Sequence, residues 1–281
     1  MDKSRTKMKE LQCGRFKLDL NRPLVMGILN VTPDSFSDGG HYHHIDAALA
    51  HAEKLLADGA DILDIGGEST RPGAAFVPAE EEISRVIPVI KALQSLNVPL
   101  SIDTRKSTVM RAALDVGVDL VNDISALEDE GALALVAKSH AAICLMHMQG
   151  DPHNMQATPA YLDVVAEVSA YLAARRDAAL AVGISHHRLL LDPGFGFGKT
   201  LEHNVALFKA LPDMQEQLAT PLLIGVSRKS MLGQITGRGV GDRMPASIAA
   251  ALMAAQAGSA VIRVHDVRET VDALKIWHAL Q

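Results

Sequence analysis

The sequence predicts an α/β protein, a (β/α)8 TIM barrel, and three observations lead to this prediction. Eight short runs rich in Val, Ile and Leu alternate along the chain with segments of helical periodicity. The runs show little polar/apolar alternation, which is typical of strands buried on both faces of a parallel sheet. Most of the runs end in a polar residue that opens a loop, as strands do at the catalytic face of such barrels. Strict alternation over eight units favours a closed barrel.

The predicted strands are short, and helical segments separate them. They are Pro23–Leu29, Asp61–Ile65, Pro99–Ile102, Asp119–Val121, Ala141–Met146, Arg188–Leu191, Pro221–Val226 and Ala260–Val264. An open doubly wound sheet is the alternative fold. Its glycine fingerprint usually follows the first strand, and residues 26–40 contain none, so we favour the barrel.

The predicted helices follow the strands in order. They are Ile45–Leu56, Ala79–Leu93, Ser107–Leu114, Gly131–Ala137, Tyr161–Val182, Leu201–Leu211, Pro245–Ala257 and Val267–Leu280. Gly59, Gly117 and Gly183 stand where helices usually stop. The connections Val31–His44 and Gly66–Pro78 are unusually long, and loops of this length in a compact domain are usually functional.

Length, charge and cysteine content restrict the class of protein. A barrel of about 250 residues would use nearly all of the chain, so we expect one domain over residues 1–281, with 1–20 as an N-terminal lead-in. Its 27 basic and 33 acidic residues argue against a nucleic-acid partner, although not against a local anion site. Cys13 and Cys144 indicate a reduced cytoplasmic protein. The polar N-terminus and the lack of a long apolar stretch indicate no secretion signal and no membrane partner.

Polar residues at the ends of buried strands form the predicted site. Asn30 ends the first strand, and its amide oxygen could complete a Mg²⁺ shell, although the following loop could equally be a surface turn. Asp103, Asn122 and Asp192 end three other strands. Two carboxylates and an amide in one pocket are costly unless they bind something, and they suit the edge of an amino-pyrimidinone heterocycle. Each alone could instead cap a helix.

Two glycine-containing segments are further candidates. GGESTRPGA offers Thr70 and Arg71 in a loop, with an exposed turn as the alternative. LDPGFGFGKT lacks the first glycine of a phosphate-binding P-loop, because Pro193 stands there. Its glycines favour a chain reversal beside a ligand, with Phe195 and Phe197 as candidate walls.

The last two strands carry cations. GVSRKS lacks the second glycine of a serine hydrolase's nucleophile elbow, but a helix beginning near Ser230 would present free amide groups to an anion. Arg263 and His265 follow in RVHD, at the usual phosphate site of this fold. Structural ion pairing with Asp266 or Glu269 is the alternative.

The histidines do not indicate zinc. His41–His44 lack a carboxylate partner at helical spacing, and no HExxH motif occurs, so a solvated loop is expected there. His147 is expected to support the site, and Met146 and Met148 to form apolar wall or core.

In combination these motifs resemble the dihydropteroate synthases of bacterial folate synthesis. MGILNVTPDSFSDGG, GGESTRPGA, SIDT, NDI, CLMHMQG, LDPGFGFGK, GVSRKS and RVHDV stand in the family's order. The resemblance implies a (β/α)8 barrel, commonly a homodimer. It implies a transferase that joins 4-aminobenzoate to (7,8-dihydropterin-6-yl)methyl diphosphate, releasing diphosphate with Mg²⁺ as cofactor. Sulfonamides, shaped like aminobenzoate, should inhibit it.

The resemblance also implies a role for individual residues. Those that would bind pterin are Asp103, Asn122, Asp192 and Lys229. Those that would hold diphosphate are Asn30, Arg263 and His265. Those that would frame aminobenzoate are Phe36, Thr70, Arg71, Pro72, Phe197 and Ser230. Asn30 would ligate Mg²⁺, with Asp34 beside it. The residues expected to act in catalysis are Asn30, Asp103, Lys229, Arg263 and His265.

We expect an SN1-like substitution in which diphosphate leaves before the arylamine attacks. Arg105, Ser107 and residues 237–246 depart from the family pattern, which affects the expected loop packing more than the activity. A methyltetrahydrofolate-dependent corrinoid methyltransferase is one alternative, but it has no use for a diphosphate site. A non-catalytic pterin-binding paralogue is another, but it should have lost parts of the long loops.

Overall fold

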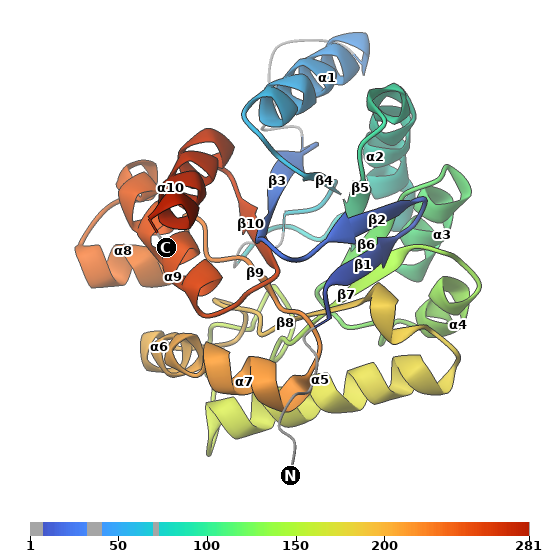
Figure 1. Cartoon of the computed structure of the whole chain (residues 1–281). Helices are drawn as coiled ribbons and strands as arrows, with labels where there is room; N and C mark the ends of the chain where they lie inside the picture. Colours follow the sequence, from blue (N-terminus) through green and yellow to red (C-terminus); the bar gives the residue numbers. More distant parts are fainter. Residues whose placement is uncertain (1–7, 33–40, 70–72, 281) are drawn as a thin grey trace.

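Eight parallel strands form a closed barrel, which confirms the predicted fold class (Figure 1). The computed structural model describes residues 8–32, 41–69 and 73–280. The barrel strands are β3 Leu24–Asn30, β4 Ile62–Gly66, β5 Leu100–Asp103, β6 Leu120–Asp123, β7 Ala142–Met146, β8 Leu189–Asp192, β9 Leu223–Ile224 and β10 Val261–Val264. They pair in the order β8-β7-β6-β5-β4-β3-β10-β9. A parallel bridge between Leu191 and Leu222 joins the two ends.

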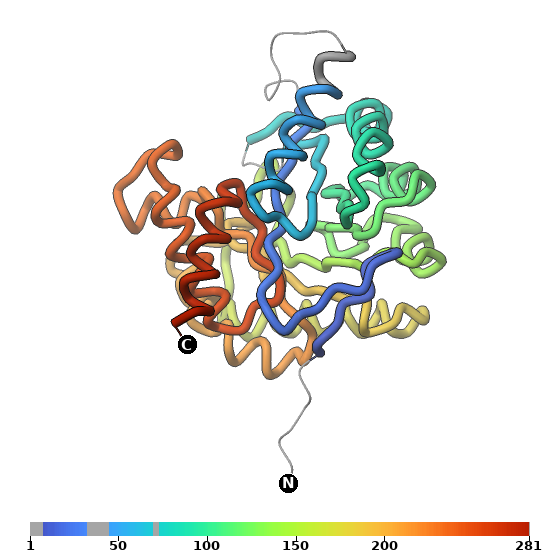
Figure 2. The backbone as a smooth tube through the Cα atoms, turned by 45° about the horizontal axis from the view of Figure 1, so that its top comes forward, coloured from blue at the N-terminus to red at the C-terminus, as the bar shows by residue number. Residues whose placement is uncertain are grey.

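The helices surround the strands. They are α1 His41–Ala57, α2 Ala79–Leu93, α3 Ser107–Asp115, α4 Ala132–Ala137, α5 Val164–Ala181, α6 Leu201–Lys209, α7 Leu211–Leu218, α8 Ser230–Thr236, α9 Met244–Gln256 and α10 Val267–Ala279, with short 3-10 turns η2 Gln94–Leu96, η3 His186–Arg188 and η4 Val240–Asp242. All eight predicted helices are present. Helix α7 was not expected as a separate element. In Figures 1 and 2 the last helix, α10, lies beside β3, the first barrel strand, which pairs with the last strand, β10.

Two helix starts differ from the prediction by more than one residue. The expected solvated loop at His41–His44 is wrong, because these residues form the first turn of α1. Helix α5 begins at Val164 rather than Tyr161. The Asp163 carboxylate accepts hydrogen bonds from the backbone amides of Val165 and Ala166, and this cap sets where the helix begins.

The first residues form a hairpin that closes one end of the barrel. Strands β1 Glu10–Cys13 and β2 Phe16–Asp19 pair antiparallel where only a lead-in was expected. Leu11 and Cys13 are fully buried and pack with inward-facing barrel residues such as Met26. The hairpin reverses at Gly14, which has φ +55°, and a Cβ there would lie 2.5 Å from Asp119 Oδ1. The barrel interior is therefore sealed at this end.

A second, larger apolar layer lies between the strands and the helices. Alternate apolar residues of most strands belong to the two layers, as Leu63 and Ile65 face the helices while Ile62 faces the barrel interior. Near the carboxyl ends of the strands, the alternate residues that face the interior therefore point into the barrel mouth. No described helix combines the length and the apolar character needed to cross a membrane.

Candidate functional site

Strand register brings the predicted polar residues together at the open end of the barrel. Asn30 pairs with Gly66, Gly66 with Asp103, and Asp103 with Asn122, so these positions form one row across four strands. Gly66 leaves a gap in this row, since a Cβ there would lie 3.7 Å from Asn30 Oδ1 and 3.8 Å from Asp103 Oδ2. The row thus presents an amide and a carboxylate on either side of a small concavity.

Arg263 connects this row through two carboxylates. Its Nη2 donates to Asp103 Oδ2 at 2.6 Å, and its Nε donates to Asp64 Oδ2 at 2.6 Å. Asn122 Nδ2 donates to the same Asp64 oxygen at 3.1 Å. Asp64 is fully buried, and its Oδ1 has no hydrogen-bond partner in the described structure. Asp64 therefore holds both Arg263 and Asn122, although it is not among the site residues predicted from the sequence.

Burial and charge act against each other in this cluster. Burial raises the pKa of Asp103 above its usual value, and Arg263 opposes that rise. Burial also disfavours the Arg263 guanidinium, but Asp64 and Asp103 outweigh it and raise the Arg263 pKa. The guanidinium therefore remains charged within the barrel mouth, where its positive charge can act on a bound anion.

Asp192 and Lys229 complete the pocket from the other side. Asp192 is nearly buried, and its Oδ1 accepts a hydrogen bond from Gly194 N at 2.7 Å. Lys229 Nζ donates to the carbonyl oxygen of Phe195 and lies 4.5 Å from the centre of the Phe197 ring. Burial lowers the Lys229 pKa to about 8, with Asp192 opposing the shift. The ammonium and the Phe197 ring therefore form adjoining walls.

The expectation for Phe195 is wrong. Its side chain is fully buried and packs against the Phe208 ring, with centroids 5.6 Å apart, so it belongs to the core and not to a ligand wall. The loop glycines allow close backbone packing. A Cβ on Gly194 would lie 1.9 Å from His147 O, and one on Gly198 would lie 2.3 Å from Gln149 O.

A strained residue directs Lys229 inward. Arg228 has φ +59°, which is unfavourable for a residue with a side chain. Its Nε donates to Asp266 Oδ2 at 3.1 Å, and its backbone N donates to Ser247 Oγ at 2.9 Å. The neighbouring Ser227 Oγ lies 3.0 Å from His265 Nδ1, which ties the ends of β9 and β10 together. The predicted pairing of Asp266 exists, but its partner is Arg228 and not Arg263.

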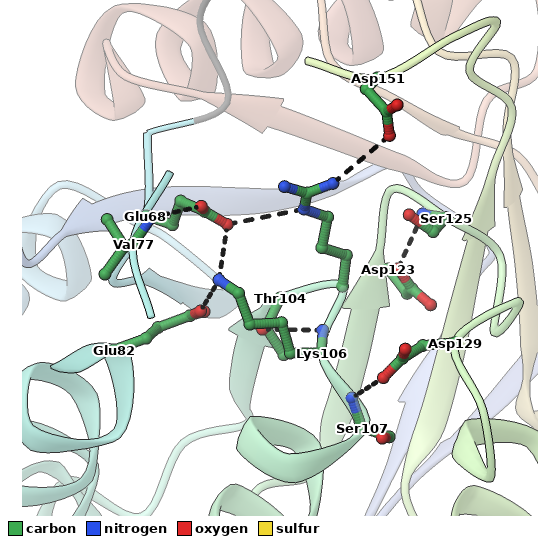
Figure 3. Close-up of polar contacts among 11 residues, drawn as sticks. Glu68, Val77, Glu82, Thr104, Lys106, Ser107, Asp123, Ser125, Asp129 and Asp151 are labelled. Atoms are coloured by element: carbon green, nitrogen blue, oxygen red, sulfur yellow. Dashed lines mark hydrogen bonds and ion pairs between the residues drawn. The ribbon is translucent and has the colours of Figure 1, made fainter. Parts of the chain in front are cut away.

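A second polar cluster holds the base of the long loop after β4. Glu68 Oε1 accepts from Val77 N at 3.0 Å, and so joins the two ends of that loop. Figure 3 shows Lys106 between Glu68 and Glu82, with Nζ–O distances of 2.8 and 2.6 Å. A cavity of about 330 Å³ lies beside this cluster, with Phe76 and Arg105 in its wall. Arg105, a departure from the family pattern, thus contacts the loop and not the pocket floor.

Several predicted residues lie outside the described part of the chain. They are Asp34, Phe36, Thr70, Arg71 and Pro72. Ser230 is the first residue of α8, next to Lys229. Within residues 8–32, 41–69 and 73–280, no three His, Cys, Asp or Glu side chains are grouped so that they could hold a metal ion. The described part of the site has polar groups on its floor, and a cation and an aromatic ring on its wall.

Comparison with known proteins identifies similar sequences along almost the whole chain. A family model described as pterin binding enzyme matches residues 26–265. The chain is 55% identical over 273 residues to the dihydropteroate synthase of Neisseria meningitidis serogroup C, a match that covers 96% of each protein. It is 50% identical over 263 residues to that of Escherichia coli K12, covering 93% of each.

Solved structures agree in fold and sequence. Xanthomonas albilineans dihydropteroate synthase with 4-aminobenzoic acid superposes with a TM-score of 0.91 at 52% identity, covering 97% of this chain and 98% of that one. The Burkholderia cenocepacia enzyme complexed with 7,8-dihydropteroate has a TM-score of 0.88 at 52% identity, covering 96% of each. The Yersinia pestis enzyme in a sulfonamide drug complex has a TM-score of 0.90 at 49% identity, covering 96% and 98%.

Proposed function

The chain belongs to the pterin binding enzyme family, among its dihydropteroate synthases, and from this premise we propose how its residues carry out the reaction. The enzyme is a transferase that joins 4-aminobenzoate to (7,8-dihydropterin-6-yl)methyl diphosphate. The products are 7,8-dihydropteroate and diphosphate. The observation that carries the assignment of the pocket is the convergence of Asp103, Asn122 and Arg263 on one buried network, with Asp192 and Lys229 across the barrel mouth.

The pterin ring occupies the floor of the barrel mouth. Its amino-pyrimidinone edge offers N–H donors, which the carboxylates of Asp103 and Asp192 accept. Lys229 donates to a ring oxygen or nitrogen, and Asn122 can both donate and accept. Ligand binding must compete for Lys229, whose ammonium donates to Phe195 O in the ligand-free protein.

The diphosphate lies nearer the solvent, between neighbouring strands. Asn30 ends β3, and His265 follows β10, the strand paired with β3. Arg263 lies between these two positions and the pterin floor, so its positive charge can stabilise the departing diphosphate without leaving Asp64 and Asp103.

Mg²⁺ fits the oxygen donors on this side of the pocket. The Asn30 amide oxygen is a hard ligand, and Gly66 leaves space beside it. Asn30, with Asp34 from the following loop, would hold the ion. When bound, Mg²⁺ would neutralise part of the negative charge of the diphosphate.

Bond breaking precedes bond making. The C–O bond between the pterin methylene and the diphosphate breaks, and its electron pair leaves with diphosphate. The cation that remains is delocalised over the pterin ring and stabilised by Asp103 and Asp192. The arylamine lone pair then forms the C–N bond, and the nitrogen loses one proton to the released diphosphate or to solvent water.

Aminobenzoate binds between the pterin and solvent. Phe197, whose ring lies against Lys229, forms one wall, and Ser230 receives the carboxylate. Phe36, Thr70, Arg71 and Pro72 would close the other side. Sulfonamides would compete at this subsite, as the drug complex of the similar Yersinia pestis enzyme supports.

Measurement of diphosphate release tests this function. We expect release from the pterin diphosphate with Mg²⁺ to increase strongly when 4-aminobenzoate is added, and dihydropteroate to form in equal amount. Diphosphate release without dihydropteroate would contradict the proposed transfer. No release, with pterin binding retained, would indicate a non-catalytic pterin-binding protein, and methyl transfer to a corrinoid would indicate the other alternative.

A homodimer in the cytoplasm is part of the proposal. Exposed apolar side chains lie on the last two helices, with Met253 of α9 55% exposed and Ile276 of α10 63% exposed. A symmetric pairing of these helices would cover them. Both cysteines are buried and free, as is usual in a reducing compartment. Light scattering of Met253→Lys and Ile276→Lys tests this, because both should give monomers if the surface is the interface.

A further inference from the structure

Every backbone carbonyl of residues 194–198 accepts a hydrogen bond from a side chain. The donors are Lys199 to Gly194 O and Phe197 O, both at 3.0 Å, Lys229 to Phe195 O, Gln156 to Gly196 O, and Tyr161 to Gly198 O at 2.8 Å. This loop follows Asp192 and carries Phe197, so its shape determines the back of the pterin pocket. Lys199 supplies two of the five bonds.

Lys199 is buried, with 3% of its surface exposed, and the proposed reaction does not use it. Its third donor reaches His147 Nδ1 at 2.9 Å. Burial, and then Lys199, lowers the His147 pKa to about 3, so the imidazole is a neutral acceptor. Burial also lowers the Lys199 pKa to about 7, with Asp192 opposing the shift. Below that pH, the ammonium donates its three N–H groups to uncharged acceptors, namely Gly194 O, Phe197 O and His147 Nδ1.

The positive charge of Lys199 acts on Asp192. Burial raises the Asp192 pKa, and three cations oppose this, namely Lys229, Lys199 and Arg263. The Cys144 thiol also faces Asp192 from β7, and stays protonated because burial raises its pKa. Lys229 and Arg263 are placed to contact substrate. Lys199 lies behind the loop, so its effect on Asp192 persists whether or not the pocket is filled.

We propose that Lys199 is a positioning residue of the pterin site, which holds residues 194–197 behind Lys229 and keeps the Asp192 carboxylate ionised for the ligand. The proposal rests on the proposed function, since it concerns the same pocket. It makes Lys199 a determinant of pterin affinity without contact to the pterin. The chain offers a matched control in Tyr161, because its hydroxyl supports the same row of carbonyls without a charge.

The test is calorimetric affinity for 6-hydroxymethylpterin between pH 5 and 8, with KM and kcat at pH 7. In Lys199→Met we expect binding at pH 6 to weaken about tenfold, and the pH below which affinity is lost to rise by about one unit, because Asp192 is protonated more readily. KM for the pterin diphosphate should rise more than kcat falls. Lys199→Arg should restore the wild-type pH profile, and Tyr161→Phe should leave it unchanged.

Two results would overturn the proposal. One is a wild-type pH profile in Lys199→Met, and the other is an equal shift in Tyr161→Phe, which would assign the effect to loop support alone. Thermal unfolding checks that each variant folds. If Lys199→Met does not fold, Lys199→Gln carries the same expectation, since it donates hydrogen bonds without charge. Failure of the wild type to bind pterin would instead overturn the proposed function.

Discussion

Replacement of Asp64 tests the network beneath the pocket most directly. Its carboxylate is fully buried and accepts hydrogen bonds from Arg263 and Asn122. Asp64→Asn keeps the shape and an acceptor oxygen but removes the negative charge. Arg263 would then keep one carboxylate partner, Asp103, and the unpaired Oδ1 position would carry an amide group with no acceptor.

The expected loss follows from the kind of bond removed. A hydrogen bond to a charged group contributes about 1.5–3 kcal/mol, and removing one partner of a buried ion pair costs about 3–5 kcal/mol. Asp64→Asn should therefore lower the free energy of unfolding by about 2 kcal/mol, and Asp64→Ala by about 4 kcal/mol. Pterin affinity should fall about tenfold in Asp64→Asn, because Arg263 and Asn122 are then held by a neutral acceptor in place of a carboxylate.

Urea unfolding of a double-mutant cycle measures the coupling. Asp64→Asn, Arg263→Met and the double variant should give a coupling energy of about 2 kcal/mol. Glu81→Gln is the control, since Glu81 pairs with Arg85 on the surface of α2 and should change stability by less than about 1 kcal/mol. A coupling energy near zero, or a pterin affinity equal to wild type in Asp64→Asn, would refute the reasoning.

Three further variants test other parts of the site. Glu68→Ala should raise KM for aminobenzoate several-fold and leave pterin affinity unchanged in calorimetry, because it frees only the loop base; the reverse pattern would contradict this. Lys229→Ala should abolish pterin binding, and unchanged affinity would remove Lys229 from the site. The folded-state pKa of His147 is lowered from 6.5 to about 3, so the unfolded chain binds more protons between these values and stability is lost as pH falls below 6.5. In urea titrations from pH 4 to 5.5, His147→Gln should reduce that slope by ~1.4 kcal/mol per pH unit, and an unchanged slope would contradict this.

Strand and helix positions were predictable because apolar composition and periodicity depend on local burial. The polar strand ends were predictable for the same reason, since Asp103 and Asn122 interrupt otherwise apolar runs. Asp64 was missed, although it has the same signal. It lies between Leu63 and Ile65, and its parity with Ile62 places it inside the barrel, where an unpaired carboxylate would be costly.

Other features depend on contacts between distant segments. The hairpin pairs within residues 10–19, but its burial requires the barrel end that it covers. Phe195 and Phe197 have the same residue type and similar neighbours, yet one packs against Phe208 and the other against Lys229. Only the backbone path of the loop determines which ring lies in the core and which lies beside Lys229. Lys199 was considered only within a failed P-loop pattern, because its partner His147 is 52 residues away.

The hairpin that closes one end of the barrel limits how substrates enter and products leave. Leu11 and Cys13 fill the far end, so both reactants must arrive, and both products leave, through a single opening. A pterin bound on the floor leaves the aminobenzoate site open to solvent. An arylamine bound first would instead obstruct the entry of the pterin. With the pterin placed as proposed, the closed end leads us to expect that the pterin diphosphate binds before 4-aminobenzoate.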